Sequence, residues 1–339
     1  MENPDKYRLL IDKFSDLPIL VIGDVMIDSY IYGTADRLSP EAPVPVVSVK
    51  KRVNRLGGAA NVALNLQAMG SRPILLSVCG KDEKGNDFIQ LLKEHSISPE
   101  GIFQSPERIT TTKFRVIGNN MQLIRVDEEV THLLTATEEK EILARLHLLT
   151  ESHAFAAIIF QDYDKGSISP ALIHEVSVIA HKKGIPVVVD PKKRNFTEYK
   201  NVSLFKPNLK ELREGLKLDK LPSFGEEFEK ALIEFSNSIA CDILMVTLSE
   251  QGVAICTGDN TEKSVKYFPA HRRNIADVSG AGDTVISIAA LCLGVGMTAQ
   301  DMARISNLAG GMVCEYVGVV PVPKEKFILE LRNDKTLES

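Results

Sequence analysis

Short apolar runs that each end in a polar residue recur along this chain, and they constrain its fold more than any other feature. The runs cover residues 18–24, 74–82, 156–162, 186–190, 203–208 and 242–247. Continuous apolar runs of this length are typical of strands that are buried on both faces of a sheet. Helical patterns lie between several of the runs, at residues 137–150, 168–183 and 226–239. This alternation predicts an α/β fold with a mostly parallel central sheet and right-handed crossovers.

The polar residues at or near the ends of these runs suggest where a ligand binds. They are Asp24, Asp82, Asp162, Asp190, Asn208 and Thr247. Taken singly, each residue type is favoured in turns and helix caps. Ligands of open parallel sheets bind at the carboxyl ends of the strands, and all six side chains would lie along that edge. Together they predict a crevice for a polar ligand.

Two β-rich segments, at about residues 28–53 and 108–127, interrupt the alternation. Prolines occur within the first segment, which favours edge strands. The second contains Gly118-Asn119-Asn120, a sequence typical of a hairpin turn. We expect the two segments to form a small sheet outside the main one, as a lid. The alternative is a set of surface loops with edge strands.

Composition excludes several classes of protein. The chain has 339 residues and a formal net charge of -5, so a broad nucleic-acid surface is not expected. No apolar run approaches the ~20 residues of a membrane span, and the N-terminus lacks the apolar region of a signal peptide. The five cysteines show no CxxC or zinc spacing. This pattern favours buried, reduced thiols in a cytoplasmic protein.

The strongest local signal is the segment DVSGAGD at Asp277–Asp283, which precedes a long apolar stretch typical of a buried helix. Gly280 and Gly282 allow a tight turn, and free N–H groups at the helix start form an anion site. Asp283 would lie in the first turn, where the helix dipole should keep it ionised. There it can accept a proton from a hydroxyl that attacks a bound phosphate. The alternative is a plain turn followed by an acidic residue.

Other nucleotide-binding motifs are absent from the sequence. The Walker pattern GxxxxGK[ST] does not occur, and no GxGxxG opens a helix. A P-loop or a Rossmann cofactor site is therefore not expected.

The DVSGAGD segment resembles the C-terminal signature DTxGAGD of the ribokinase-like (PfkB) carbohydrate kinases, with Val278 in place of threonine. Three further segments are similar to motifs of that family, in the family order: GGAAN at 57–61, NLKE at 208–211 and TLSEQG at 247–252. On these four motifs the chain is identified as a member of the family from about residue 19 to residue 320.

The resemblance implies a domain organisation as well as a fold. It implies a three-layer α/β/α kinase domain at 19–330 with a small β-sheet lid. A helix at 1–18 would precede the domain, and a flexible tail at 331–339 would follow it.

The resemblance implies an enzyme that uses ATP and Mg²⁺, with a monovalent cation left open. Asp283 would be the catalytic base, beside the phosphate turn formed by Gly280, Ala281 and Gly282. The nucleotide would contact Lys192, Thr247, Ser249, Gly252 and Asn307, while Asn208 and Glu211 would act on Mg²⁺ through water. The residues expected to bind the sugar are Asp24, Asp28, Gly57, Gly58, Asn61 and Asp162.

Five segments resemble one subgroup, the kinases that phosphorylate D-glycero-β-D-manno-heptose 7-phosphate at O1 for ADP-heptose and lipopolysaccharide synthesis: IGDVMIDSYIYG, RLSPEAPVPVV, GGAANVALN, TTTKFRV and QLIRVD. Lys113, Arg115 and Arg125 would bind the 7-phosphate, with Arg37 and Arg55 as further nearby cations. The alternatives are a kinase for fructose, ribose or 2-keto-3-deoxygluconate, or a sugar- or nucleotide-binding regulator without catalysis.

The same resemblance bears on the architecture of the whole enzyme. In many bacteria this kinase is fused to an adenylyltransferase, whose HxGH motif is absent from this sequence, so we expect a form with the kinase alone. The lid would expose apolar strand faces at Tyr30, Tyr32, Val44 and Val46, which predicts a homodimer formed through the lid. Neither a nucleic acid nor a membrane is expected as a partner.

Overall fold

A nine-stranded sheet forms the centre of the protein, whose computed structural model describes residues 6–258, 262–271 and 273–334. Every neighbouring pair in it is parallel except the two pairs that β12 forms. The strands, in spatial order, are β13 (Ser264–Phe268), β12 (Val253–Thr257), β11 (Ile243–Thr247), β10 (Leu204–Phe205), β9 (Val187–Asp190), β8 (Ala157–Gln161), β1 (Pro18–Gly23), β4 (Arg72–Gly80) and β5 (Ile102–Ser105).

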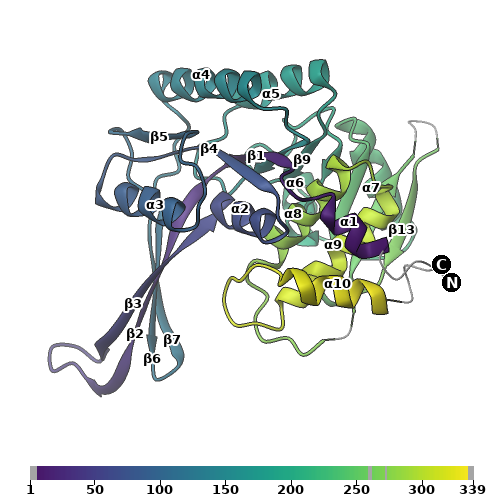
Figure 1. Ribbon diagram of the computed structural model, residues 1–339. Helices are drawn as coiled ribbons and strands as arrows, with labels where there is room; N and C mark the ends of the chain where they lie inside the picture. Colours follow the sequence, from purple (N-terminus) through teal and green to yellow (C-terminus); the bar gives the residue numbers. More distant parts are fainter. Residues whose placement is uncertain (1–5, 259–261, 272, 335–339) are drawn as a thin grey trace.

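Helices cover both faces of this sheet, so the molecule has three layers (Figure 1). Successive strand residues point to opposite faces: Ile19 and Val21 pack into one core cluster, while Leu20 and Ile22 pack into the other. One layer contains α1 (Lys6–Asp12), α2 (Ala59–Ala68), α3 (Glu83–Glu94), α8 (Ala281–Gly294), α9 (Ala299–Val313) and α10 (Lys324–Asn333). The other contains α4 (Ala136–Ser152), α5 (Pro170–Lys183), α6 (Leu209–Leu216) and α7 (Glu226–Ser238). The predicted α/β fold is confirmed.

The strand order reverses at β1, which places a ligand crevice at a definite point. The chain adds β4 and β5 on one side of β1, and later returns to add β8 on the other side. Gly23, at the end of β1, lies so close to Gln161 of β8 that an added Cβ would come within 2.1 Å of the Gln161 carbonyl oxygen. Open sheets bind ligands at the carboxyl ends of the strands beside such a reversal.

A second sheet projects from the body as a long curved ribbon (Figure 1). Its order is β3 (Pro45–Gly58), β2 (Val25–Leu38), β6 (Thr112–Gly118) and β7 (Met121–Glu128). Asn119 and Asn120 join β6 to β7 with positive φ angles of 52° and 65°, as tight hairpin turns require. Pro45 is the first residue of β3, an edge strand. The small sheet predicted from the sequence is confirmed.

The end of the chain differs from the prediction. Helix α10 continues to Asn333, and Leu331 is fully buried in the core, so the tail does not begin at 331. Residues 335–339 of the predicted tail lie outside the described part of the chain. The five cysteines are buried and form no disulfide. No helix among the described residues is long and apolar enough to cross a membrane.

Candidate active site

The start of α8 forms a turn with free backbone donors. Gly280 caps the helix with a left-handed φ of 82°, a conformation that favours glycine. Across the described part of the chain, the N–H groups of Gly282 and Asp283 donate to no protein acceptor. Because the positive end of the helix dipole lies here as well, this turn can bind an anion such as a phosphate.

Asp283 is buried in the first turn of α8, with three donors on its carboxylate. Oδ2 accepts a hydrogen bond of 2.6 Å from the amide of Asn61, which lies on α2. Oδ1 accepts one of 3.1 Å from the Gln161 amide and one of 2.8 Å from the Tyr163 hydroxyl. The carboxylate is thus held at the carboxyl end of β8, where the topology places the crevice.

Burial raises the pKa of Asp283 to about 6, against the lowering effects of the Asn61 and Tyr163 hydrogen bonds. Asp190 raises this pKa further, and Lys206 lowers it. The sequence predicts an ionised carboxylate stabilised by the helix dipole, whereas loss of hydration in the fold shifts the pKa the other way. Asp283 is therefore mainly ionised above pH 6 and becomes protonated below it.

A chain of alternating charges extends from Asp283 along the crevice. Lys206 pairs with Asp190 at 3.0 Å, and both side chains are almost completely buried. Gln161 also donates to Asp190, at 3.3 Å, and so joins that carboxylate to Asp283. Lys192 lies 5.5 Å from the centre of the Tyr163 ring and pairs with Glu211.

Asn208 and Glu211 form the cap of α6 through reciprocal hydrogen bonds of 2.8 Å between each side chain and the other residue's N–H group. The remaining Glu211 oxygen pairs with Lys192. Among the described residues, no group of three or more His, Cys, Asp and Glu is placed to hold a metal. A single carboxylate, that of Glu211, beside the Asn208 amide fits Mg²⁺, which takes one or two carboxylates and completes its shell with phosphates and water. Glu211 lies near enough to Asp190 to raise its pKa, although burial has the larger effect.

The remaining nucleotide candidates line one end of the sheet. Thr247 forms a β-bridge with Asn208. Ser249 begins a short 3₁₀ helix (Ser249–Gln251), and Gly252 ends it with a φ of 96°. The Asn307 amide donates to the Pro269 carbonyl at 2.9 Å, beside the loop that contacts Gly252. Thr247 thus lies next to Asn208, and Asn307 and Gly252 lie at the same loop around Pro269, while the contact of these residues with a nucleotide stays a prediction.

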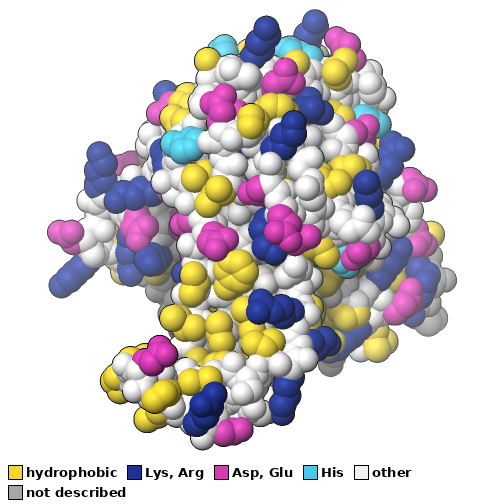
Figure 2. All heavy atoms as spheres, turned by 90° about the vertical axis from the view of Figure 1, so that its left-hand side faces the viewer, with side chains coloured by type: hydrophobic (Ala, Val, Ile, Leu, Met, Phe, Trp, Pro, Cys, Tyr) yellow, Lys and Arg dark blue, Asp and Glu magenta, His cyan; other side chains and the backbone are white. Residues whose placement is uncertain are grey.

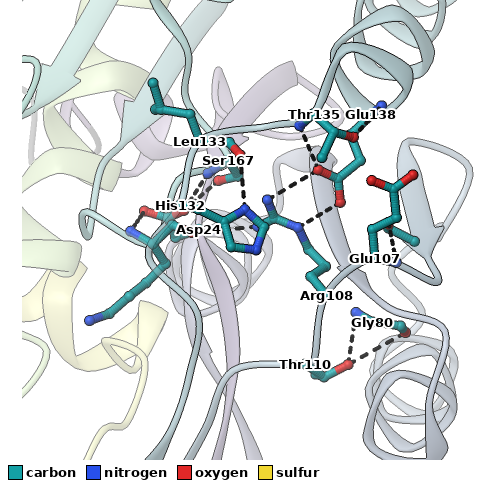
Figure 3. Close-up of polar contacts among 12 residues, drawn as sticks. Asp24, Gly80, Glu107, Arg108, Thr110, His132, Leu133, Thr135, Glu138 and Ser167 are labelled. Atoms are coloured by element: carbon teal, nitrogen blue, oxygen red, sulfur yellow. Dashed lines mark hydrogen bonds and ion pairs between the residues drawn. The ribbon is translucent and has the colours of Figure 1, made fainter.

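Asp24 and Asp162, predicted to bind the sugar, support a loop instead. Asp24 is 2% exposed and accepts four hydrogen bonds, from the N–H groups of Tyr163, Lys165 and Ser167 and from the Ser167 hydroxyl. Figure 3 shows Asp24 beside Ser167, its partner in two of these bonds. Asp162 is also buried and accepts bonds from Asp164, Asn195 and Tyr199. The donors fill all four acceptor positions of Asp24 and three of the four of Asp162, and these bonds hold the loop at 162–167 in place.

Asp82 is likewise a cap rather than part of the crevice. It accepts hydrogen bonds from the Gly85 N–H group at the start of α3 and from both the N–H group and the hydroxyl of Thr110. A nearby buried ion pair between Arg108 and Glu138, at 2.8 Å, fastens the same region to α4 (Figure 3).

Asp24→Asn tests the supporting role of Asp24. Asparagine keeps one acceptor oxygen and turns an NH₂ group toward donors, so we expect a loss of about 2–3 kcal/mol of unfolding free energy. A urea titration of the purified variant measures this loss. If Asp24 only bound the sugar, the KM for sugar would rise and the urea midpoint would stay the same.

Three cations of the lid are held in ion pairs. Arg115 pairs with Asp28 at 2.5 Å, and Gly57 lies beside the second oxygen of Asp28. Lys113 and Arg125 each pair with Asp127 at 3.0 Å. The carboxylates present in the lid therefore already hold all three residues predicted to bind the 7-phosphate.

Tyr30 and Arg55 differ from the expectation for the lid. Tyr30 is buried at 8% exposure, with the Arg55 and Arg115 guanidinium groups 5.1 and 5.3 Å from its ring centre, so it is not an exposed apolar residue. Arg55 forms no ion pair with any described residue, and it lies beside Gly318. Gly318 belongs to the loop that packs on Gly280 through Val319. Arg55 thus has no carboxylate partner in the described chain and lies beside the loop that packs on the phosphate turn.

Comparison with known proteins decides the family. Residues 17–325 match the family described as pfkB family carbohydrate kinase. The chain belongs to the pfkB family of carbohydrate kinases. The phosphate turn and the buried carboxylate of Asp283 are thus features of a carbohydrate kinase.

Relatives of the kinase are longer than the chain. The bifunctional protein HldE of Geobacter metallireducens is 36% identical over 315 residues, which cover 92% of this chain and 62% of that protein. The bifunctional protein HldE of Magnetococcus marinus is 37% identical over 327 residues, or 94% of this chain and 65% of that protein. The chain thus spans less than two thirds of the length of these relatives.

Solved structures share the fold of the kinase at low sequence identity. Phosphofructokinase-2 from Escherichia coli in complex with potassium has a TM-score of 0.75 at 18% identity, over 94% of this chain and 98% of that one. Arabidopsis thaliana ribokinase complexed with ribose and ATP has a TM-score of 0.69 at 17% identity, over 94% and 99% of the two chains. These matches confirm the ribokinase-like fold.

Three residues of the kinase site were not found from the sequence: Gln161, Tyr163 and Lys206. Lys206 had a visible signal, because a lysine that ends a buried strand such as Leu204–Phe205 is rarely buried without a partner. Gln161 and Tyr163 flank Asp162, and only the fold shows that they, and not Asp162, contact the carboxylate of Asp283.

Proposed function

We propose that this sugar kinase transfers the γ-phosphoryl group of ATP to O1 of D-glycero-β-D-manno-heptose 7-phosphate, giving the 1,7-bisphosphate for ADP-heptose synthesis. The observation that carries the chemistry is the buried Asp283 carboxylate beside the free N–H groups of the phosphate turn. The choice of sugar rests on 34–37% identity to proteins named HldE.

In this proposal the sugar hydroxyl lies between Asp283 and the γ-phosphorus. Its proton passes to Asp283 as its oxygen bonds to phosphorus, and the bond from phosphorus to the ADP oxygen breaks. Because the transition state of phosphoryl transfer is loose, the base needs good position more than high basicity. The N–H groups of Gly282 and Asp283 would donate to the transferred phosphoryl oxygens.

ATP and Mg²⁺ would lie along the row of charges beside the turn. Lys192, Thr247, Ser249, Gly252 and Asn307 would hold the nucleotide. Asn208 and Glu211 would bind Mg²⁺ through water. When bound, Mg²⁺ supplies neutralising charge to the phosphates. Lys192, now paired with Glu211, would exchange that pairing for one with a phosphate oxygen.

The sugar would lie under the lid. Asp28 and the backbone at Gly57 and Gly58 would contact hydroxyls, and Arg115 would orient Asp28. For the 7-phosphate we retain Lys113, Arg115 and Arg125, and we add Arg55, which needs to break no ion pair within the described chain. A dianion recruits such guanidinium groups readily.

We also propose a homodimer formed through the lid. Hydrophobic side chains gather around the lid in the lower part of Figure 2, and the exposed ones on the lid include Leu38, Val44, Val49, Met121 and Ile124. Covering them with a second copy would remove these apolar side chains from water, which favours association. Light scattering at micromolar concentration is expected to give twice the chain mass, and a monomer mass would contradict this assembly.

A substrate panel tests the choice of sugar. With ATP and Mg²⁺, heptose 7-phosphate should give a kcat/KM at least about 10³-fold above those of fructose, ribose and 2-keto-3-deoxygluconate, since a site built for a phosphate loses paired contacts without it. Mass spectrometry should show a bisphosphate product. A comparable rate with a neutral sugar would contradict the proposed substrate. No phosphorylation of any sugar would favour a binding regulator.

A further inference from the structure

We propose that Tyr163 is a positioning residue for the catalytic base: its hydroxyl, together with the Gln161 amide, occupies Oδ1 of Asp283 and leaves Oδ2 as the oxygen that receives the sugar proton. This inference rests on the proposed role of Asp283. The geometry separates the two carboxylate oxygens, because they carry different numbers of donors.

Counting acceptor positions shows why the two oxygens differ. A carboxylate oxygen offers about two positions for hydrogen bonds. Oδ1 has both filled, by Gln161 at 3.1 Å and Tyr163 at 2.8 Å. Oδ2 accepts only the Asn61 amide, at 2.6 Å, so within the described residues it keeps one position open. An incoming hydroxyl that approached Oδ1 would first have to displace a donor.

The surroundings of Tyr163 hold its hydroxyl on Oδ1. Its own N–H group donates to Asp24 at 2.8 Å, and three further bonds to Asp24 fix the loop that follows. The Lys192 ammonium lies 5.5 Å from the centre of the Tyr163 ring. The backbone is thus fixed by one buried carboxylate while the side chain is placed against another.

Tyr163 acts as a donor and not as a second base. Burial and the neighbouring carboxylates of Asp283 and Asp190 raise its pKa well above the ordinary value, so the hydroxyl keeps its proton. The hydroxyl cannot then compete with Asp283 for the sugar proton. Its contribution is to prevent rotation of the carboxylate, which would carry Oδ2 away from the hydroxyl.

The test is Tyr163→Phe, with kcat measured from pH 5 to pH 8.5 on heptose 7-phosphate and ATP. Loss of a hydrogen bond to a carboxylate should lower kcat about tenfold to a hundredfold, with the KM for ATP unchanged. The parent should lose activity as the pH falls through about 6, the pKa of Asp283. The variant loses the Tyr163 hydroxyl, which lowers the pKa of Asp283, while the other groups around the base stay in place: Asn61, Asp190, Lys206 and Lys192. The pH below which activity falls, the acid limb, should therefore move to a higher value.

Tyr199→Phe is the matched control. It also removes a buried hydroxyl, one that donates to an aspartate, Asp162, at 2.9 Å, but has no contact with Asp283. We expect it to lose stability while keeping the parent kcat and acid limb. The proposal is overturned if Tyr163→Phe leaves either kcat or the acid limb unchanged, or if Tyr199→Phe changes both equally. Asp283→Asn, run in parallel, reports separately on the base: if that variant keeps the parent kcat, the assignment of Asp283 as the base has failed, whatever Tyr163→Phe shows, whereas a loss in Asp283→Asn with parent kinetics in Tyr163→Phe overturns only the role of Tyr163.

Discussion

Asp283→Asn should lower kcat by about 10²–10⁴-fold while the KM for ATP stays within about twofold of the parent value. The amide cannot take the sugar proton, but it still fills the space beside the phosphate turn. The new side chain keeps an oxygen that can accept from Gln161 and Tyr163. Its NH₂ group takes the position of Oδ2, so the Asn61 amide must turn its own oxygen toward it to keep a hydrogen bond. Steady-state kinetics with a coupled ADP assay measure the effect.

Stability provides the control for this variant. Burial disfavours the Asp283 charge, as its raised pKa shows, so removing the charge should not lower the melting temperature. Asp87→Asn, at an aspartate whose side chain is 40% exposed, should retain parent kinetics. An Asp283→Asn enzyme with parent kcat would show that another group accepts the proton.

Lys206→Met should destabilise the protein by about 3–5 kcal/mol at pH 8, because it leaves Asp190 buried without its cation. The two residues are 2% and 5% exposed, and their ion pair measures 3.0 Å. Lys206 also lies next to Gly282, so activity should fall as well. Denaturant titration at pH 8 and at pH 5 measures the loss of stability.

The pH dependence of this loss has a definite sign. Burial already raises the pKa of Asp190, and Lys206 lowers it, so the variant raises it further. A carboxyl whose pKa is higher in the folded protein than in the unfolded chain destabilises the fold above the folded pKa, and the penalty fades as the pH falls below it. The loss should therefore be smaller at pH 5 than at pH 8.

Two variants separate the buried ion pair from general effects of the substitution. The double variant Asp190→Asn/Lys206→Met should recover part of the lost stability, because no buried charge remains unpaired. Lys210→Met removes a lysine of an exposed pair with Glu214 and should change the stability by less than about 1 kcal/mol. Equal losses in Lys206→Met and Lys210→Met would contradict the account of the buried pair.

The layers of this fold could be predicted because each strand carries its own signal. Apolar runs such as Ala157–Gln161 and Ile243–Thr247 indicate buried strands by their own composition, without knowledge of which strands pair with them. The prolines of the lid favour edge strands because proline has no N–H group to donate to a neighbouring strand. The phosphate turn could also be predicted, because its glycines and the aspartate of the first helical turn are close together in the sequence.

The partners of the polar side chains could not be predicted in the same way. Asp24 and Asp28 are four residues apart and look alike in the sequence, yet the donors to Asp24 come from residues 139–143 positions further along the chain. Asn61 was expected to contact sugar, but its amide meets Asp283, 222 positions away. Such pairings depend on how the strands are ordered, and no local pattern records them.

A crystal structure with a non-hydrolysable ATP analogue and heptose 7-phosphate tests the central claim most directly. We expect the γ-phosphate on the N–H groups of Gly282 and Asp283, with the O1 hydroxyl about 2.6–3.2 Å from Oδ2 of Asp283. A nucleotide bound away from this turn, or a sugar whose hydroxyls all lie beyond reach of the carboxylate, would contradict it.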